Sequence, residues 1–191
     1  MNLFWIPLGA GAGGSLVRVS GRLFEALAAA FARRPPQALF HSALEVHVDG
    51  ARTTVEMAPV WTGTGDRGVV SEGPVGARFL GRFRLFRYEI RRWRGGSIPD
   101  LAAAVGGAVA VSRDRETARM LLDLIPEFPC RTWGRDELGT GDMWNSNSLV
   151  SWLLVRAGID TSAISPPHDG RAPGWVAGVA VASRARGDSA T

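Results

Sequence analysis

The stretch "ALFHSALEVHVDGARTTVEMAPV", residues 38–60, contains two β-prone runs that flank a short turn. Apolar and polar residues alternate before the turn, and the run from Thr53 to Val60 after it is also β-prone. Asp49-Gly50 is a dipeptide that favours the two-residue turn of a β-hairpin. The stretch therefore predicts an antiparallel hairpin, in which residues whose numbers add up to 99 face each other.

Three segments have the spacing of helices. Residues 15–34 carry apolar side chains at near-helical intervals and end at a pair of prolines. In residues 113–125 the apolar side chains share one face, which predicts an amphipathic helix. A third helix is expected from about Ser146 to Ala157, with Gly158 as its C-terminal cap. The apolar face of the second helix consists of Ala118, Leu121, Leu122 and Ile125.

Strands are expected at both ends of the chain as well. Residues 3–8 and 174–182 have strand character, and residues 62–77 are rich in Gly and Thr, which is typical of a loop. The fold class predicted from these elements is α+β, an antiparallel sheet with N-terminal and C-terminal helices packed on it. We expect one domain over residues 1–183 and a disordered tail over 184–191.

The composition limits the classes of site. Hydrophobic residues make up 46% and charged residues 21% of the 191 residues, which is ordinary for a globular domain. All 22 basic side chains are arginines and the net charge is only +4, so compositional bias explains the arginines before a nucleic acid does. A single cysteine, Cys130, excludes internal disulfides and multi-cysteine metal sites.

The sequence also indicates where the protein is located and which cofactors it needs. No run of about 18 strongly apolar residues predicts a membrane span. The N-terminus lacks the basic segment of a secretory signal. We therefore expect a cytoplasmic protein with no membrane span, no metal and no cofactor, while its oligomeric state stays open.

Two motifs favour a structural interpretation over a functional one. Gly9, Gly11 and Gly14 fit the G-x-G-x-x-G pattern of dinucleotide sites, but position 34 is an arginine where an acidic ribose ligand is needed. A flexible glycine turn is favoured. Residues 78–94 interleave arginines with aromatic side chains, as single-strand nucleic-acid platforms do. We favour one or two strands, with the aromatic residues inside and the arginines outside in surface ion pairs, and expect no nucleic-acid binding.

The hairpin carries a histidine in a distinctive position. His41 opens the first strand on its polar face, and Glu56 on the returning strand lies opposite Ala43. His41 and Glu56 are then diagonal neighbours on one face, within reach of a long side chain. A shifted register or a bulge would separate them. His47 and His168 are expected to be structural.

The segment "GDMWNSNSLVSWLLVRAG", residues 141–158, changes from a polar turn to an apolar helix at Asn145 to Ser148. Small polar residues at this junction are typical of helix capping. The same turn also stabilises developing negative charge, which suits a nucleophile. Ser146 is thus either a cap or a nucleophile.

These features resemble the circularly permuted branch of the NlpC-type papain-like superfamily, which includes lecithin retinol acyltransferase and the bacterial YiiX-like proteins. "HSALEVHVDGARTTVEMA", residues 41–58, is similar to their histidine hairpin, and "WNSNSLV", residues 144–150, to their cysteine-bearing helix start. The resemblance covers roughly residues 40–157. It implies a permuted papain-like fold with Ser146 in the place of the nucleophilic cysteine.

The resemblance implies a mechanism and leaves alternatives open. Ser146 is the nucleophile, His41 the base and Glu56 the residue that orients it. The N–H groups of Ser146 and Asn147 stabilise an oxyanion, with the Asn145 and Asn147 side chains around them. The substrate is an unknown small molecule, lipid or peptide with an amide or ester bond.

The first alternative is an inactive binding or interaction module of the same fold, in which Ser146 is only an N-cap. A weaker one is an arginine-rich nucleic-acid-binding domain. Cys130 is a further, minor candidate for a working thiol. If the site exists, His41 should lie within about 4 Å of the Ser146 hydroxyl.

Overall fold

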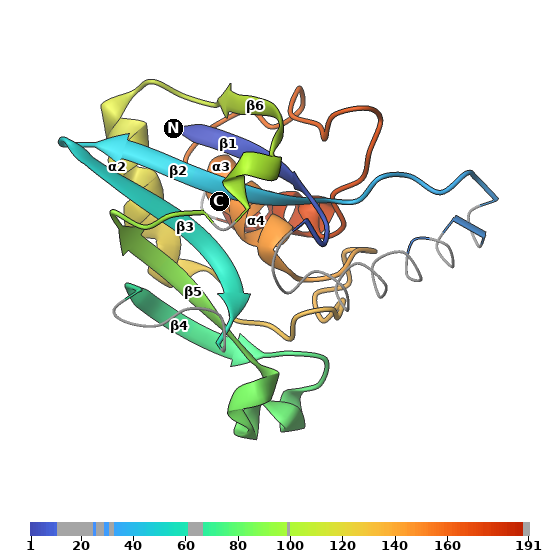
Figure 1. The fold of residues 1–191 in the computed structure, drawn as a ribbon. Helices are drawn as coiled ribbons and strands as arrows, with labels where there is room; N and C mark the ends of the chain where they lie inside the picture. The colour runs from blue at the N-terminus through green and yellow to red at the C-terminus, as the bar shows by residue number, and fades with distance from the viewer. Residues whose placement is uncertain (11–24, 26–28, 31–32, 61–66, 99, 189–191) are drawn as a thin grey trace.

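The computed structural model describes residues 1–10, 25, 29–30, 33–60, 67–98 and 100–188, with only the backbone for 186–188. Its centre is a six-stranded, wholly antiparallel sheet in the order β4-β5-β3-β2-β1-β6 (Figure 1). The α+β class and the antiparallel sheet predicted from the sequence are therefore observed. The strands are β1 Asn2–Pro7, β2 Phe40–Val48, β3 Ala51–Pro59, β4 Val69–Pro74, β5 Arg87–Arg94 and β6 Val105–Ala110.

Helices cover one face of this sheet (Figure 1). The α-helices are α2 Arg115–Leu124, α3 Ser146–Arg156 and α4 Trp175–Asp188, and four short 3-10 turns, η1 Arg78–Arg82, η2 Arg84–Phe86, η3 Leu101–Ala103 and η4 Ile125–Glu127, connect other elements. The main core lies between these helices and the sheet, and one contiguous cluster of buried side chains runs from Met1 to Ala182. Strand alternation places Phe4, Ile6 and Ala43 on the opposite face, in a second small cluster with Ile98.

The central hairpin has the predicted register. Leu44 pairs with Val55 and Val48 with Ala51, so facing residues add up to 99. Asp49 and Gly50 both have positive φ, 53° and 72°, as a type I′ turn requires. The hairpin prediction is confirmed.

The amphipathic helix is also confirmed. Ala118, Leu121, Leu122 and Ile125 are all buried against the sheet. Asp114 caps this helix because its carboxylate accepts a hydrogen bond from the Thr117 N–H.

The strand expected at 174–182 is wrong, because this segment begins helix α4. Its small residues allow a close approach to α3, since a Cβ on Gly178 would clash with the Ser151 Oγ and the Ser148 carbonyl oxygen. Ser151 also donates to the Trp175 carbonyl. Tight helix packing therefore overrides the local β preference of the valines. The helix continues to Asp188 and so includes residues 184–188 of the expected tail.

Two strands were missed and one segment was assigned wrongly. β4 forms inside the predicted 62–77 loop, and the glycine-rich β6 pairs with β1. In 78–94, only β5 is a strand, because residues 78–86 form η1 and η2 with exposed aromatic side chains. Gly11 and Gly14 of the glycine motif, and most of the predicted 15–34 helix, lie outside the described residues.

Candidate functional site

The four polar residues at the start of α3 have four different roles. Asn145 is the N-cap: its Oδ1 accepts from the Asn147 N–H at 2.9 Å and from the Ser148 N–H at 3.4 Å. Ser148 completes a capping box, since its hydroxyl accepts from the Asn145 N–H at 3.0 Å. The interpretation of Ser146 as the cap is therefore wrong. Its hydroxyl is not needed to begin the helix.

Asn147 binds the edge of β2 as a neighbouring strand would. The β2–β3 ladder ends at the Leu44–Val55 pair, and β2 and β3 diverge from their shared turn (Figure 1). In the place of a β3 residue, Asn147 Oδ1 accepts from the Ser42 N–H at 2.7 Å, and its Nδ2 donates to the Phe40 carbonyl at 3.0 Å. One side-chain amide thus satisfies the backbone groups on both sides of His41.

This attachment places Ser146 next to His41. Ser146 immediately precedes Asn147, and its Oγ lies 2.7 Å from His41 Nδ1. The sequence prediction that the two side chains lie within about 4 Å is confirmed. A serine hydroxyl hydrogen-bonded to an imidazole is the arrangement of a nucleophile and its general base.

Burial determines the charge of the histidine. It lowers the pKa of His41 to about 4, because the surrounding protein disfavours the imidazolium. His41 is therefore neutral at pH 7, and Nδ1 accepts the Ser146 hydroxyl proton when Nε2 carries the ring hydrogen. The same burial makes His41 a weaker base than an ordinary histidine. A carboxylate on Nε2 would counteract that effect.

The helix start supplies one of the two expected oxyanion donors. The Ser146 N–H makes no hydrogen bond to any described residue, and it lies at the positive end of α3. The Asn147 N–H, in contrast, is bonded to Asn145 Oδ1. The Asn145 and Asn147 side chains are likewise occupied by capping and by β2, so both hold the site in place instead of facing a reacting carbonyl.

Glu56 is not joined to His41. Its carboxylate accepts from Arg91 at 2.7 Å, across the β3–β5 ladder in which these two residues pair directly. Arg91 also binds Glu89, which binds Arg67. The four side chains form a buried ionic cluster, and each charge has an opposite partner there. The β2–β3 register is as predicted, but the two strands separate beyond the Leu44–Val55 pair. Glu56 therefore does not reach the His41 imidazole.

No residue replaces Glu56 in the part of the chain that the structure describes: His41 Nε2 has no hydrogen-bond partner there. Sequence reasoning also missed the roles of Ser42 and Arg91. Ser42 interrupts the otherwise apolar side of β2, which was a signal of a polar contact. Arg91 lies opposite Glu56 once β5 is placed beside β3.

The other candidates lie elsewhere. His47 contacts Glu45, and His168 has a φ of 55° in a loop. The exposed Cys130 thiol donates to the Ser71 hydroxyl on β4 at 3.3 Å. β4 is the sheet edge three places from β2, and among the described residues no hydrogen bond joins the Cys130 side chain to Ser146 or His41.

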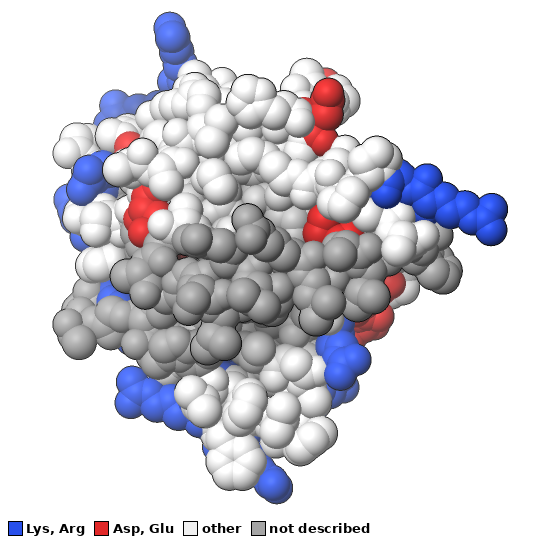
Figure 2. Space-filling view, turned by 45° about the vertical axis from the view of Figure 1, so that its right-hand side comes forward, with Lys and Arg blue, Asp and Glu red and all other residues white. Residues whose placement is uncertain are grey.

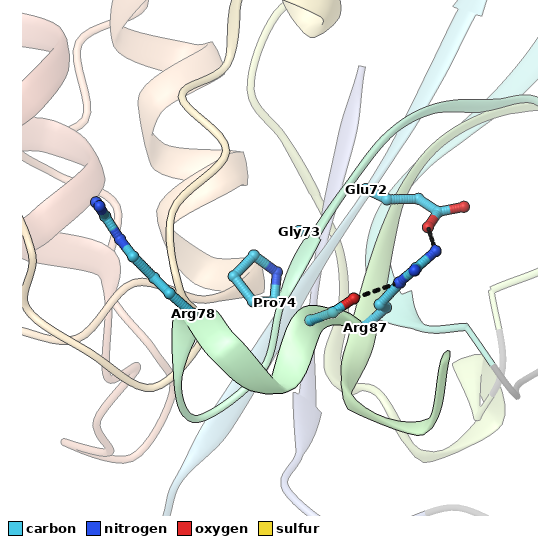
Figure 3. A pocket seen from close by; sticks show the side chains of 6 residues that line it. Glu72, Gly73, Pro74, Arg78 and Arg87 are labelled. Carbon is cyan, nitrogen blue, oxygen red and sulfur yellow. Dashed lines mark hydrogen bonds and ion pairs between the residues drawn. The ribbon is translucent and has the colours of Figure 1, made fainter. Parts of the chain in front are cut away.

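A surface pocket lies at the other end of the sheet, between β4, η1 and the start of β5 (Figure 3). Its two arginines are already paired: Arg78 binds Glu137, and Arg87 binds Glu72 and the Gly81 carbonyl. The pocket therefore has little charge left for an anionic ligand, and we place the candidate site at Ser146 and His41.

The described residues contain no cluster of three or more metal-ligating side chains of the His, Cys, Asp and Glu types. None of the helices in the described part is long and apolar enough to cross a bilayer. Comparison of the chain with protein-family models, with curated proteins and with solved structures gives no match.

Proposed function

We propose that the chain is an acyl-transfer enzyme, a hydrolase or acyltransferase of an amide or ester, with Ser146 as nucleophile and His41 as base. The observation that carries this proposal is the 2.7 Å contact of Ser146 Oγ with His41 Nδ1 at the N-terminus of α3. It gains weight because Asn145 and Ser148 already cap the helix. Other residues therefore provide the capping of α3, and the Ser146 hydroxyl is not needed for it.

The proposed reaction follows from the contact. Ser146 Oγ attacks the substrate carbonyl carbon while its proton passes to His41 Nδ1, and the carbonyl oxygen becomes an oxyanion near the Ser146 N–H. Collapse of this intermediate breaks the bond to the leaving group, which takes the proton from His41. Water or a second acceptor, deprotonated by His41, then releases the acyl group from Ser146.

The fold proposed for this enzyme is the permuted papain-like one. The order of the parts supports it: a histidine on a central hairpin of an antiparallel sheet comes first, and a nucleophile at a buried helix start comes last. The serine in place of a cysteine and the ion pair of Glu56 with Arg91 are departures from the pattern that suggested it.

A second function is favoured by two observations. His41 Nε2 has no partner among the described residues, and Ser146 is 5% exposed. Such a pair suits a binding or interaction module that keeps the geometry of an enzyme without its reactivity. The two functions differ in whether Ser146 reacts.

Labelling with a fluorophosphonate probe distinguishes them. The enzyme proposal expects phosphonylation at Ser146, located by mass spectrometry, and its loss in Ser146→Ala and His41→Gln. Ser162→Ala and His47→Gln are matched controls, since both residues lie outside the site and should leave labelling unchanged. A folded wild-type protein that stays unlabelled at Ser146 would support the binding module.

A further inference from the structure

The end of the molecule opposite to the β2–β3 turn carries an exposed apolar tip. We use this name for residues 79–86, which include most of η1, all of η2 and the residue between them. Four of the nine exposed large hydrophobic side chains in the described part of the chain lie here. Phe79 is 67% exposed and Leu85 62%. Arg82 to Phe86 are five consecutive exposed residues. The four apolar side chains are Phe79, Phe83, Leu85 and Phe86.

The tip is held in shape by its base. Arg87 donates to the Gly81 carbonyl at 2.6 Å and to Glu72, and Figure 3 shows both contacts as dashed lines. Arg78 is tied to Glu137. Successive 3-10 hydrogen bonds connect Ala77, Leu80, Phe83 and Phe86. The apolar side chains are therefore presented on an ordered backbone, which lowers the entropy lost on binding.

The charges on the tip differ from those at its base. Arg82 and Arg84 are exposed and make no ion pair with any described residue, and the Arg82 guanidinium lies 4.7 Å from the Phe83 ring centroid. Residues 77–88 contain four arginines and no acidic residue. Figure 2 shows uncharged side chains flanked by basic ones at this lower end of the molecule. The tip thus combines exposed apolar groups with uncompensated positive charge.

Size and charge together identify the partner. A stable protein interface uses about 20–30 residues on each side, far more than a convex tip of eight residues offers. Aromatic and leucine side chains that flank arginines suit the boundary between headgroups and acyl chains, where anionic lipids attract the arginines. We propose that the tip docks the protein on an anionic lipid surface, with its apolar side chains among the acyl chains and Arg82 and Arg84 on lipid phosphates.

Co-sedimentation with vesicles tests this proposal independently of any reaction at Ser146. The wild-type protein should bind vesicles of phosphatidylcholine and phosphatidylglycerol, and bind phosphatidylcholine vesicles much more weakly. The double variant Phe79→Ser/Leu85→Ser should lose at least about tenfold in partitioning, because two exposed side chains no longer enter the lipid. Arg82→Gln/Arg84→Gln should lose about tenfold on the anionic vesicles only, and its binding should depend less on salt.

Met120→Ser and Val176→Ser are the matched controls, since both remove an exposed apolar side chain from a helix far from the tip in sequence. They should bind as the wild type does. All four substituted tip residues are exposed, so thermal unfolding should be unchanged and a loss of binding reports on the surface.

Three results would overturn the proposal. The first is a wild-type protein that does not sediment with anionic vesicles, and the second is a Phe79→Ser/Leu85→Ser variant that sediments as well as the wild type. The third is a protein that does not bind vesicles but binds a single-stranded oligonucleotide, or dimerises, through the tip. That result would assign the tip to another partner.

Discussion

Replacing Asn147 by alanine should destabilise the protein more than any other single change at the start of α3. The Asn147 amide makes four hydrogen bonds: it accepts from the Ser42 N–H and hydroxyl, and it donates to the Phe40 and Pro173 carbonyls. All four contacts are buried. The substitution removes the Asn147 amide from each of these hydrogen bonds and leaves the group on the other side buried in the protein.

The size of the effect follows from these contacts. The Ser42 hydroxyl can rotate to another acceptor, and the Pro173 carbonyl still accepts from Asn145 Nδ2 at 2.8 Å. Two backbone groups, the Ser42 N–H and the Phe40 carbonyl, stay buried without a partner. Each such group costs about 1–3 kcal/mol. With partial repair by water, we expect a loss of about 2–4 kcal/mol in the free energy of unfolding. This is a large part of the roughly 5–15 kcal/mol that stabilises a typical domain.

Chemical denaturation followed by far-UV circular dichroism measures this loss, and Asn147→Asp gives an isosteric comparison. Aspartate keeps the oxygen that faces Ser42 but puts a second carboxylate oxygen against two carbonyls. Its pKa in the folded protein is then raised above the unfolded value of about 3.9. The penalty relative to wild type is therefore full at high pH and is relieved as the pH falls through the raised folded pKa.

Two results would refute this account of Asn147. The first is an Asn147→Ala variant within about 1 kcal/mol of the wild type, which is the cost of one ordinary hydrogen bond. The second is an Asn147→Asp variant whose stability relative to wild type does not change with pH. Either would show that the amide does not complete the β2 edge.

Three further predictions concern neighbouring features. In denaturant unfolding, Asn145→Ala should lower the free energy of unfolding by at least about 1 kcal/mol more than Ser146→Ala does, because Asn145 caps α3 and Ser146 does not. Glu56→Gln should lower stability by about 3 kcal/mol by breaking its buried pair with Arg91, yet leave Ser146 labelling of the folded protein unchanged. A selective loss of labelling would instead make Glu56 the orienting residue. Gly178→Ala should destabilise by about 1–3 kcal/mol through overpacking against α3, and a gain in thermal stability, as for an ordinary helical glycine, would contradict the observed packing.

The sequence predicts the local parts of this structure well. The Asp49-Gly50 turn fixes the hairpin register, and the apolar face of 113–125 identifies α2, because both signals depend on neighbours in the chain. The meeting of His41 with Ser146 joins residues that are distant in sequence. It is expected from the order of the parts in the family that the chain resembles, together with the position of Ser146 at a helix start.

What could not be predicted depends on contacts distant in sequence. Residues 174–182 read as a strand until α3 is known to lie against Gly178. Glu56 is diagonal to His41 in a flat hairpin, but β3 diverges to pair with β5 and meets Arg91. The N-cap is Asn145 and not Ser146, because the helix begins with Ser146 at its first position. Helix ends are the least certain part of a prediction.

The pH dependence of Ser146 labelling tests the central claim, that Ser146 and His41 act as nucleophile and base. Burial lowers the pKa of His41 to about 4, so the neutral imidazole that accepts the serine proton persists well below the ordinary histidine pKa of about 6.5. The rate of phosphonylation by the fluorophosphonate should therefore hold through pH 6.5 and fall with a midpoint near pH 4, in protein shown by circular dichroism to stay folded. A midpoint near pH 6.5, or a folded protein in which Ser146 does not react at any pH, would contradict the account.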